Sequence, residues 1–157
     1  MKLYHGSTVV IDQIDLAKSK PNKDFGKAFY LSDDEQQALE MAQFRAEFED
    51  ASPIVNVYEF DDSLFEIFRF KRFEKYSKEW AHFVYDHRTE PEGRTLHDYD
   101  IVYGPIANDR IGAQITRYKQ GYITFSEFLK RIQYIKGITF QYAFCTQRAI
   151  DKLIKLI

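Results

Sequence analysis

Alternation of apolar and polar side chains predicts a series of short strands. The clearest run, residues 53–60, is rich in β-branched and aromatic side chains. Similar but shorter runs predict strands at residues 2–5, 28–31, 64–70, 100–103 and 138–144. In the last of these runs, Phe140, Tyr142 and Phe144 share one face, which we expect to be core, together with Ile138. Gln141 stands at the centre of the opposite face, which is small and polar.

Two capping boxes predict where helices begin. Residues 32–35 have the Ser-x-x-Glu form, and residues 124–127 repeat it with Thr. The first box predicts a helix to about Glu49, and the second predicts a helix to about Tyr134. The first helix is expected to bury Ala38, Leu39, Met41 and Ala42. Further helices are predicted over residues 73–85 and 147–156, and residues 108–118 are irregular or helical.

This order of elements predicts an α+β fold. Strands and helices are interspersed, but no strand leads into a glycine-rich phosphate loop, as it would in a doubly wound nucleotide-binding fold. At 157 residues we expect one domain spanning residues 1–157. The apolar fraction of 45% argues against disorder. With 14 Phe and 11 Tyr, the chain carries more aromatics than a core of this size obviously needs.

Charge and cysteine usage exclude several classes of protein. A net charge of −2 gives no global attraction to nucleic acid or anionic lipid. One cysteine cannot form an internal disulfide, and a buried, inert thiol is the expected state of Cys145. The first residues lack the apolar run of a signal peptide, and no window is long enough to predict a membrane-spanning helix. We therefore expect the cytoplasm and no membrane, with export independent of a signal peptide as the alternative.

Three segments carry the residues that could support chemistry. Residues 3–7 place His5 at a strand end beside a glycine, where a backbone can approach a ligand closely. Residues 24–32 place two aromatics on opposite faces of a strand, and residues 139–145 contain Gln141. Each segment alone also fits a structural role: a satisfied histidine, an aromatic pair in a half-buried strand, and a glutamine hydrogen-bonded inside the protein.

Taken in order, four blocks of sequence resemble a known family. They read LYHGS at 3–7, DFGKAFYLS at 24–32, DIVYGPIAND at 100–109 and TFQYAFCT at 139–146. They resemble a bacterial family of formerly unknown function whose blocks look like LYHGS, DFGKGFYLT, DIVxGPxAND and TxQYxFxT. That family belongs to the diphtheria-toxin-type and poly-ADP-ribose-polymerase-type ADP-ribosyltransferases. The resemblance covers nearly the whole chain and implies an ADP-ribosyltransferase-like split β-sheet core with flanking helices.

The resemblance also implies roles for individual residues, with NAD as cosubstrate. His5 would hydrogen-bond the nicotinamide-side ribose, and the backbone of Gly6 would hold the carboxamide. Tyr30 would stack on the nicotinamide ring, and Gln141 would sit near the ribose hydroxyls. The catalytic set is therefore His5, Tyr30 and Gln141, and the NAD-binding set adds Gly6, Ser7, Phe25 and Gly26. Tyr30, Phe25 and Phe44 are expected to wall a slot for a flat ring.

The chain departs from the pattern of its relatives at the late strand. Gln141 stands where the superfamily often has Glu, and an amide supplies neither a full negative charge nor a general base. A nearby carboxylate is one way to compensate, and the candidate helpers are Asp109, Asp100 and Glu59. Ala28 replaces a glycine of the family, and Met41 stands where a tryptophan is expected.

The setting of the family implies a toxin-like or phage-defence enzyme that transfers ADP-ribose to a protein or nucleic acid and is partnered by a small cognate antitoxin. An NAD glycohydrolase and a non-catalytic module binding NAD, a nucleotide or a partner protein are the alternatives. Residues 68–76 interleave bases and aromatics, a pattern that can bind nucleic acid but is more typical of a solvated basic edge. The spacing of the histidines with Cys145 matches no zinc motif, so no metal is expected.

Overall fold

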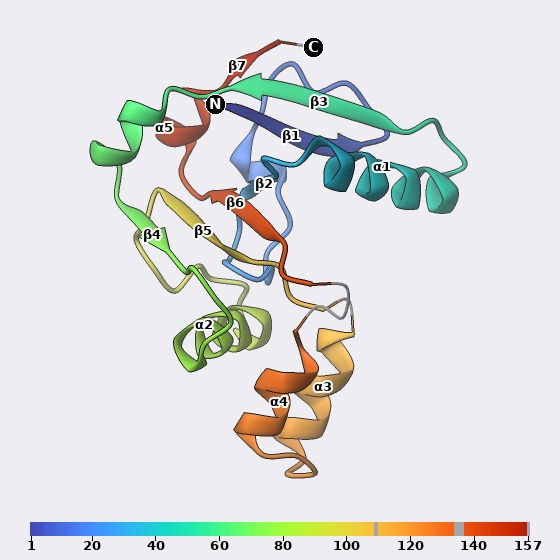
Figure 1. The fold of residues 1–157 in the computed structure, drawn as a ribbon, viewed down its shortest axis with the longest axis vertical. Coiled ribbons are helices and arrows are strands. Elements are labelled where there is room, and N and C mark those ends of the chain that lie inside the picture. Colours follow the sequence, from blue (N-terminus) through green and yellow to red (C-terminus); the bar gives the residue numbers. More distant parts are fainter. Residues whose placement is uncertain (109, 134–136, 157) are drawn as a thin grey trace.

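A computed structural model describes residues 1–108, 110–133 and 137–156 of the protein (Figure 1). Two β-sheets and five α-helices occur in these ranges, and neither sheet closes into a barrel. The predicted α+β class is therefore confirmed. No helix in the described ranges is long and apolar enough to cross a membrane.

The first sheet has the order β1-β3-β7 and is antiparallel. It consists of β1 (Lys2–Ser7), β3 (Ile54–Glu59) and the two-residue β7 (Ile154–Lys155). β1 continues through Gly6 to Ser7, where we expected a break, because Gly6 stays in register with Val55. The predicted strand over residues 53–60 is confirmed to within one residue at each end.

The second sheet has the order β2-β6-β5-β4. Its strands are β2 (Phe29–Leu31), β6 (Phe140–Phe144), β5 (Ile101–Pro105) and β4 (Phe70–Arg72). Only the β4–β5 pair is parallel among the described strands. The two sheets meet at a single backbone bridge between Tyr4 and Ser32, whose reciprocal N–H to O=C distances are 2.8 and 2.9 Å. Figure 1 shows β1 and β3 side by side, with β2 and β6 below them.

A hydrophobic core lies on each face of the second sheet. The core between the two sheets includes Leu3, Leu31, Tyr58, Phe60, Tyr142 and Phe144. The opposite face is covered by α2 (Lys78–Thr89), α3 (Ile111–Lys119) and α4 (Phe125–Arg131) (Figure 1). This second core includes Phe25, Trp80, Val102, Phe128 and Ala143. Two cores account for much of the aromatic excess. Ile138, expected to join the core, precedes β6 and is exposed.

Helix α1 (Glu35–Glu49) lies against β1 and β3 through a narrow stripe of alanines. Only Ala38, Ala42 and Ala46 of this helix are buried, so the expected burial of Met41 is wrong. Close packing requires a glycine at position 6, because a Cβ atom there would lie 2.1 Å from the Ala38 carbonyl oxygen. The larger apolar side chains Met41, Phe44 and Phe48 of α1 are exposed, whereas Leu39, which was also expected to be buried, is partly buried.

The cap of α1 also differs from the expectation. Asp34, rather than Ser32, caps the helix by accepting hydrogen bonds from the backbone N–H groups of Gln36 and Gln37 at 2.9 and 3.4 Å. Ser32 instead belongs to the bridge with Tyr4, which fixes its backbone in an extended form. The second predicted capping box, between Thr124 and Glu127, is confirmed at the start of α4.

Three other element predictions are corrected. A 3₁₀ helix, Asp62–Glu66, takes the first part of the predicted strand at 64–70, and the strand observed there, β4, begins only at Phe70. Helix α2 begins at Lys78, five residues later than expected, because the Ser77 hydroxyl caps it. The helix predicted over residues 147–156 is only α5 (Gln147–Ile150), after which the chain turns into β7. The predicted end of α4, Tyr134, lies outside the described residues, and α4 ends at Arg131. A second 3₁₀ helix, Leu16–Lys18, lies between β1 and β2.

Candidate functional site

The two sheets separate where the imidazole of His5 comes between β1 and β2. Beyond the Tyr4–Ser32 bridge, alternation along antiparallel strands directs the next backbone groups of Gly6 and Tyr30 toward each other. A continuous sheet would pair them. Instead, the Tyr30 carbonyl oxygen lies 2.7 Å from Nδ1 of His5. The histidine side chain therefore takes the hydrogen bond that the backbone of Gly6 would otherwise make.

This arrangement leaves backbone donors and acceptors open at the split. Within the described residues, no hydrogen bond pairs the N–H or C=O of Gly6 across this edge, and none pairs the N–H of Tyr30. Gly6 is buried, so these groups are also shielded from bulk water. Buried backbone groups in folded proteins are nearly always paired. A neighbouring donor and acceptor are complementary to a primary carboxamide, which presents one acceptor and one donor of its own.

His5 is held in its neutral form. Burial lowers the pKa of His5 to about 4, so the ring is uncharged at neutral pH. Because a carbonyl oxygen can only accept, Nδ1 carries the proton and donates it to Tyr30, which leaves Nε2 as an acceptor. The ring also stacks on Phe29, with centroids 4.4 Å apart. Nε2 has no hydrogen-bond partner among the described residues and can accept from a ligand hydroxyl.

Tyr30 is fixed by the turn that precedes its strand. Its hydroxyl donates to the Gly26 carbonyl at 2.8 Å and accepts from the Phe25 N–H at 2.9 Å. The turn depends on Gly26, whose φ of 90° is in the region that favours glycine. Burial, with the negative charge of Asp24 nearby, raises the pKa of Tyr30 well above its usual value. The phenol is therefore neutral, and its two hydrogen bonds hold the ring, which packs on Phe25 with centroids 6.4 Å apart, while the residue as a whole is partly buried.

Gln141 is connected to the same turn through a buried carboxylate. Its Nε2 donates to Oδ2 of Asp24 at 3.1 Å, and Asp24 is only 6% exposed. Nε and Nη2 of Arg88 donate to the other oxygen of Asp24 at 2.8 and 2.6 Å. The glutamine thus hydrogen-bonds inside the protein, which was one of its two expected states. Its Oε1 has no hydrogen bond to a described residue.

The structure brings most of the predicted set together. His5 contacts Tyr30, Tyr30 contacts the turn at Phe25 and Gly26, and Gln141 contacts Asp24 at the start of that turn. Sequence reasoning missed Asp24 and Arg88. The available signal was that Asp24 begins a segment already singled out by its aromatics and glycine. Arg88, near the end of α2, gave no comparable signal.

Three predicted contributors to the site are placed elsewhere. The Phe25 side chain is fully buried against Phe73 and Phe83, so the prediction that it walls a ring slot is wrong. Phe44 is 59% exposed on α1, where it contacts Phe48, and forms no slot wall. Ser7 is buried, and its hydroxyl accepts from the Val9 N–H at 3.3 Å.

Neither of the two described carboxylates proposed as helpers, Asp100 and Glu59, has a hydrogen bond to Gln141. Asp100 is saturated by Arg148, Thr146 and the backbone of Arg69. Glu59 is exposed near the end of β3, opposite Lys2 and away from His5. Asp109 lies outside the described residues. The carboxylate that does reach Gln141 is Asp24.

The basic strip over residues 68–76 is largely neutralised by neighbouring carboxylates. Arg69 pairs with Asp98, and Lys71 pairs with Glu79 at 2.6 Å. Arg72 lies 3.6 Å from Glu74. The aromatics at 68 and 73 are buried in the cores. The contacts match the interpretation of this segment as a solvated edge over core aromatics.

Two neutral histidines, His87 and His97, make hydrogen bonds near the turn that contains Phe25 and Gly26. Nε2 of His97 donates to the Phe25 carbonyl at 2.8 Å, and Nε2 of His87 accepts from the Leu96 N–H at 2.9 Å. Burial lowers the pKa of both imidazoles. Burial also raises the pKa of Cys145 to about 12, which matches the expected inert thiol. In the described ranges, no three histidine, cysteine or acidic side chains converge as a possible metal site.

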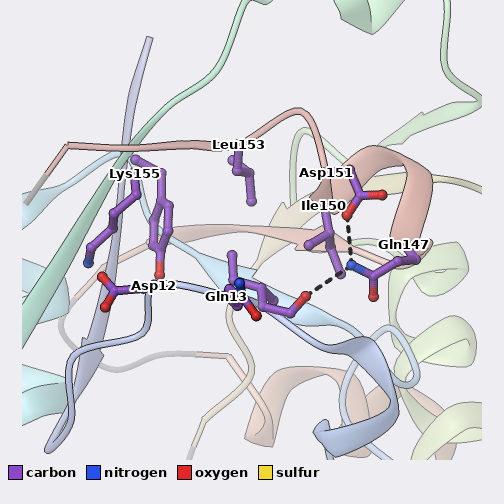
Figure 2. Close-up of a pocket in the computed structure, with 9 residues that line it drawn as sticks. Asp12, Gln13, Gln147, Ile150, Asp151, Leu153 and Lys155 are labelled. Atoms are coloured by element: carbon purple, nitrogen blue, oxygen red, sulfur yellow. Dashed lines mark hydrogen bonds between the residues drawn. The ribbon is translucent and has the colours of Figure 1, made fainter.

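A separate cavity of about 360 Å³ lies between the start of the chain and its last elements (Figure 2). Asp12, Tyr58, Gln147 and Lys155 are among its lining residues. Figure 2 shows the hydrogen bond from the Gln147 amide to the Asp151 carboxylate. Nζ of Lys155 donates a hydrogen bond to Oδ1 of Asn56 at 2.6 Å. Its polar groups are thus partly satisfied by one another.

A smaller cavity of about 220 Å³ lies at Arg69, Asp98, Asp100 and Arg148. Neither cavity is lined by His5, Tyr30 or Gln141. We place the candidate site at the split because open backbone groups and connected polar side chains meet there, which neither cavity offers.

Comparisons with known proteins identify a family for the chain. No curated protein and no solved structure matches it. A family described as "protein of unknown function (DUF3990)" matches residues 1–155, which is nearly the whole chain. With that coverage, the protein belongs to the DUF3990 family.

Proposed function

We propose that the protein is an NAD-dependent mono-ADP-ribosyltransferase. The observation that carries the proposal is the split between Gly6 and Tyr30, where a backbone donor and acceptor are left open beside a fixed aromatic ring. The resemblance of the LYHGS and DFGKAFYLS blocks to ADP-ribosyltransferases concerns these same two strands.

The chemistry that we propose needs little more than binding and positioning. The bond between ribose C1′ and the nicotinamide nitrogen breaks, and its electron pair leaves with neutral nicotinamide. The acceptor atom bonds to C1′ and releases its proton to solvent. Positive charge develops on the ribose in the transition state, so an oriented oxygen nearby is stabilising.

The residues of the split have the groups that such a substrate requires. The backbone of Gly6 can pair with the carboxamide, and the ring of Tyr30 offers a flat surface to nicotinamide. Nε2 of His5 and Oε1 of Gln141 are both acceptors without partners among the described residues, so each can accept from a ribose hydroxyl. This assignment gives a role to Nε2 of His5 and Oε1 of Gln141, two neutral acceptors that have no hydrogen-bond partner among the described residues.

We further propose a macromolecular acceptor, either a protein or a nucleic acid, in the cytoplasm. The resemblance favours a toxin-like or phage-defence enzyme with a small cognate antitoxin. The neutralised strip at residues 68–76 gives a nucleic-acid acceptor no additional support.

The test is transfer of label from NAD carrying a radioactive adenylate to macromolecules of a bacterial lysate, with the purified chain added. We expect labelled macromolecules together with free nicotinamide. Free ADP-ribose alone would establish the glycohydrolase alternative, because water would then be the acceptor. NAD binding without nicotinamide release would establish a non-catalytic binding module, and absence of both would refute the proposal.

Two variants locate the activity. Gln141→Ala removes the free acceptor of the late strand, and we expect nicotinamide release to fall at least tenfold. Phe48→Ala, on the exposed side of α1, serves as the matched surface control and should leave release unchanged. Equal activity of Gln141→Ala and wild type would place the chemistry elsewhere.

A further inference from the structure

Asp24 is the carboxylate that contacts Gln141, and its two oxygens serve different partners. Oδ1 accepts both bonds from Arg88, whereas Oδ2 accepts from Nε2 of Gln141 at 3.1 Å and from the Ala107 N–H at 3.5 Å. The three residues come from distant parts of the chain: a turn before β2, the end of α2, and β6. A buried ionic group with this division of contacts joins three elements at one point.

We propose that Asp24 is a positioning residue that fixes the amide of Gln141, with Arg88 holding Asp24 in place. This inference rests on the proposed function and names how its late-strand acceptor is oriented. It assigns roles to two residues to which the sequence analysis gave none.

The orientation of the amide follows from hydrogen-bond chemistry. A carboxylate can only accept, so the NH₂ group of Gln141 must face Asp24. The amide oxygen then projects from the opposite side of the same planar group. Without Asp24, the amide could turn about its last side-chain bond and present NH₂ to the ligand, which is the wrong polarity for a ribose that becomes positive.

Asp24 also affects the charge on that oxygen. A hydrogen bond from the amide N–H to a carboxylate polarises the amide, and such effects are stronger in a buried environment. The Gln141 oxygen therefore gains partial negative charge without being ionised. Arg88 pairs with the carboxylate at 2.6 Å, which offsets the cost of burying its charge at 6% exposure.

We expect activity to require one carboxylate, and not two, at positions 24 and 141. Gln141→Glu places a second carboxylate about 3 Å from Asp24, and like charges at that distance raise the pKa of the pair. The variant should therefore lose activity on passing from acidic to neutral pH. Combining Asp24→Asn with Gln141→Glu restores one donor and one acceptor, because the new Asn amide can donate to Glu and its oxygen can accept from Arg88.

The experiment compares wild type, Asp24→Asn, Gln141→Glu and the double variant by kcat and KM for nicotinamide release. Asp100→Asn is the matched control, since it alters a second buried aspartate–arginine pair away from the site. We expect Asp24→Asn to lower kcat by about 10- to 100-fold with a smaller change in KM. The double variant should recover at least tenfold relative to Asp24→Asn, and Asp100→Asn should keep the wild-type kcat.

Nuclear magnetic resonance of the side-chain NH₂ of Gln141 supplies a readout that does not depend on activity. We expect slow hydrogen exchange in wild type and fast exchange in Asp24→Asn, with unchanged signals in Asp100→Asn. If Asp24→Asn keeps the wild-type kcat, or the double variant is no better than Asp24→Asn, the positioning role is overturned while the transferase proposal stands. If wild type releases no nicotinamide, the proposed function fails and this role fails with it.

Discussion

Two buried aspartates, each held by an arginine, differ in what their second contacts do. Asp100 is 2% exposed and uses both oxygens on Arg148, at 2.9 and 2.6 Å. Its remaining contacts are the Thr146 hydroxyl and the Arg69 N–H, at 2.7 and 3.0 Å. Asp24 commits one oxygen to its arginine and offers the other to Gln141.

The comparison separates a structural ion pair from one connected to a site. Asp100 joins the start of β5 to the residues that open α5, and no contact of it leads to an open group. The hydrogen bonds from Arg148 hold the pKa of Asp100 far below its ordinary value. Asp24, by contrast, is hydrogen-bonded to the amide of Gln141, whose oxygen has no partner among the described residues. Burial and an arginine are thus common to both pairs, and only the outer contact distinguishes them.

The largest effect is expected from Asp100→Ala. Removing one partner of a buried ion pair should lower the free energy of unfolding by about 3–5 kcal/mol. The loss should be present at neutral pH and shrink as the pH falls below 3.8, because the unfolded wild-type chain then binds a proton at Asp100 that the folded protein, with its lowered pKa, does not yet bind. Urea unfolding at several pH values measures it. A loss of NAD affinity in the folded variant would break the distinction between the two aspartates.

Gly6→Ala tests the packing beneath the site and should have the next largest effect. A Cβ 2.1 Å from the Ala38 carbonyl oxygen must displace α1. We expect a loss of about 1–3 kcal/mol in stability. NAD affinity should also fall, because the strand that carries the open groups shifts. Isothermal titration calorimetry with NAD measures the change in affinity. An unchanged NAD affinity of Gly6→Ala would show that Gly6 does not belong to the binding site.

His5→Gln should change how stability depends on pH. Burial lowers the pKa of His5 to about 4 in the folded protein from its ordinary value of 6.5, so the unfolded chain binds a proton first as the pH falls. Wild type should therefore lose stability between pH 6.5 and pH 4, and the variant should lose less. Denaturant unfolding at pH 7 and pH 4.5 gives the comparison. Equal slopes for both proteins would show that His5 is not buried at the split.

The smallest effect is expected on the exposed side of α1. Phe48 is 80% exposed, so Phe48→Ser should change the free energy of unfolding by less than about 0.5 kcal/mol. Nicotinamide release should also be unchanged. A large loss in either measurement would mean that this helix contributes more to the site than its alanine contacts indicate.

Patterns with a local physical cause predicted the fold well. Alternation in residues 140–144 predicted the burial of Tyr142 and Phe144, although Ala143 on the opposite face is buried too, and Thr124 with Glu127 predicted the start of α4. Predictions failed where tertiary contacts decide. Ser32 has the form of a cap but pairs with Tyr4, and the last residues form β7 because β3 offers them an edge.

The site was predictable in part for the same reason. His5, Gly6, Tyr30 and Gln141 lie in short blocks that can be recognised in sequence, and the structure brings them close. Asp24 reaches Gln141 across 117 positions of sequence, and no local pattern predicts such a contact. Phe25 failed as a slot wall because the sequence does not tell which face of the turn is covered by α2.

The most direct test of the central claim is a titration of the isotope-labelled chain with NAD, followed by backbone amide chemical shifts. The claim is that the open groups between β1 and β2 bind the nicotinamide end. The backbone amide signals of Gly6 and Tyr30 should then show the largest changes in chemical shift. The same NAD concentrations should slow the hydrogen exchange of these two amides. Shifts concentrated instead at Asp12, Gln147 and Lys155 around the cavity of Figure 2, or no shifts at all, would contradict the account.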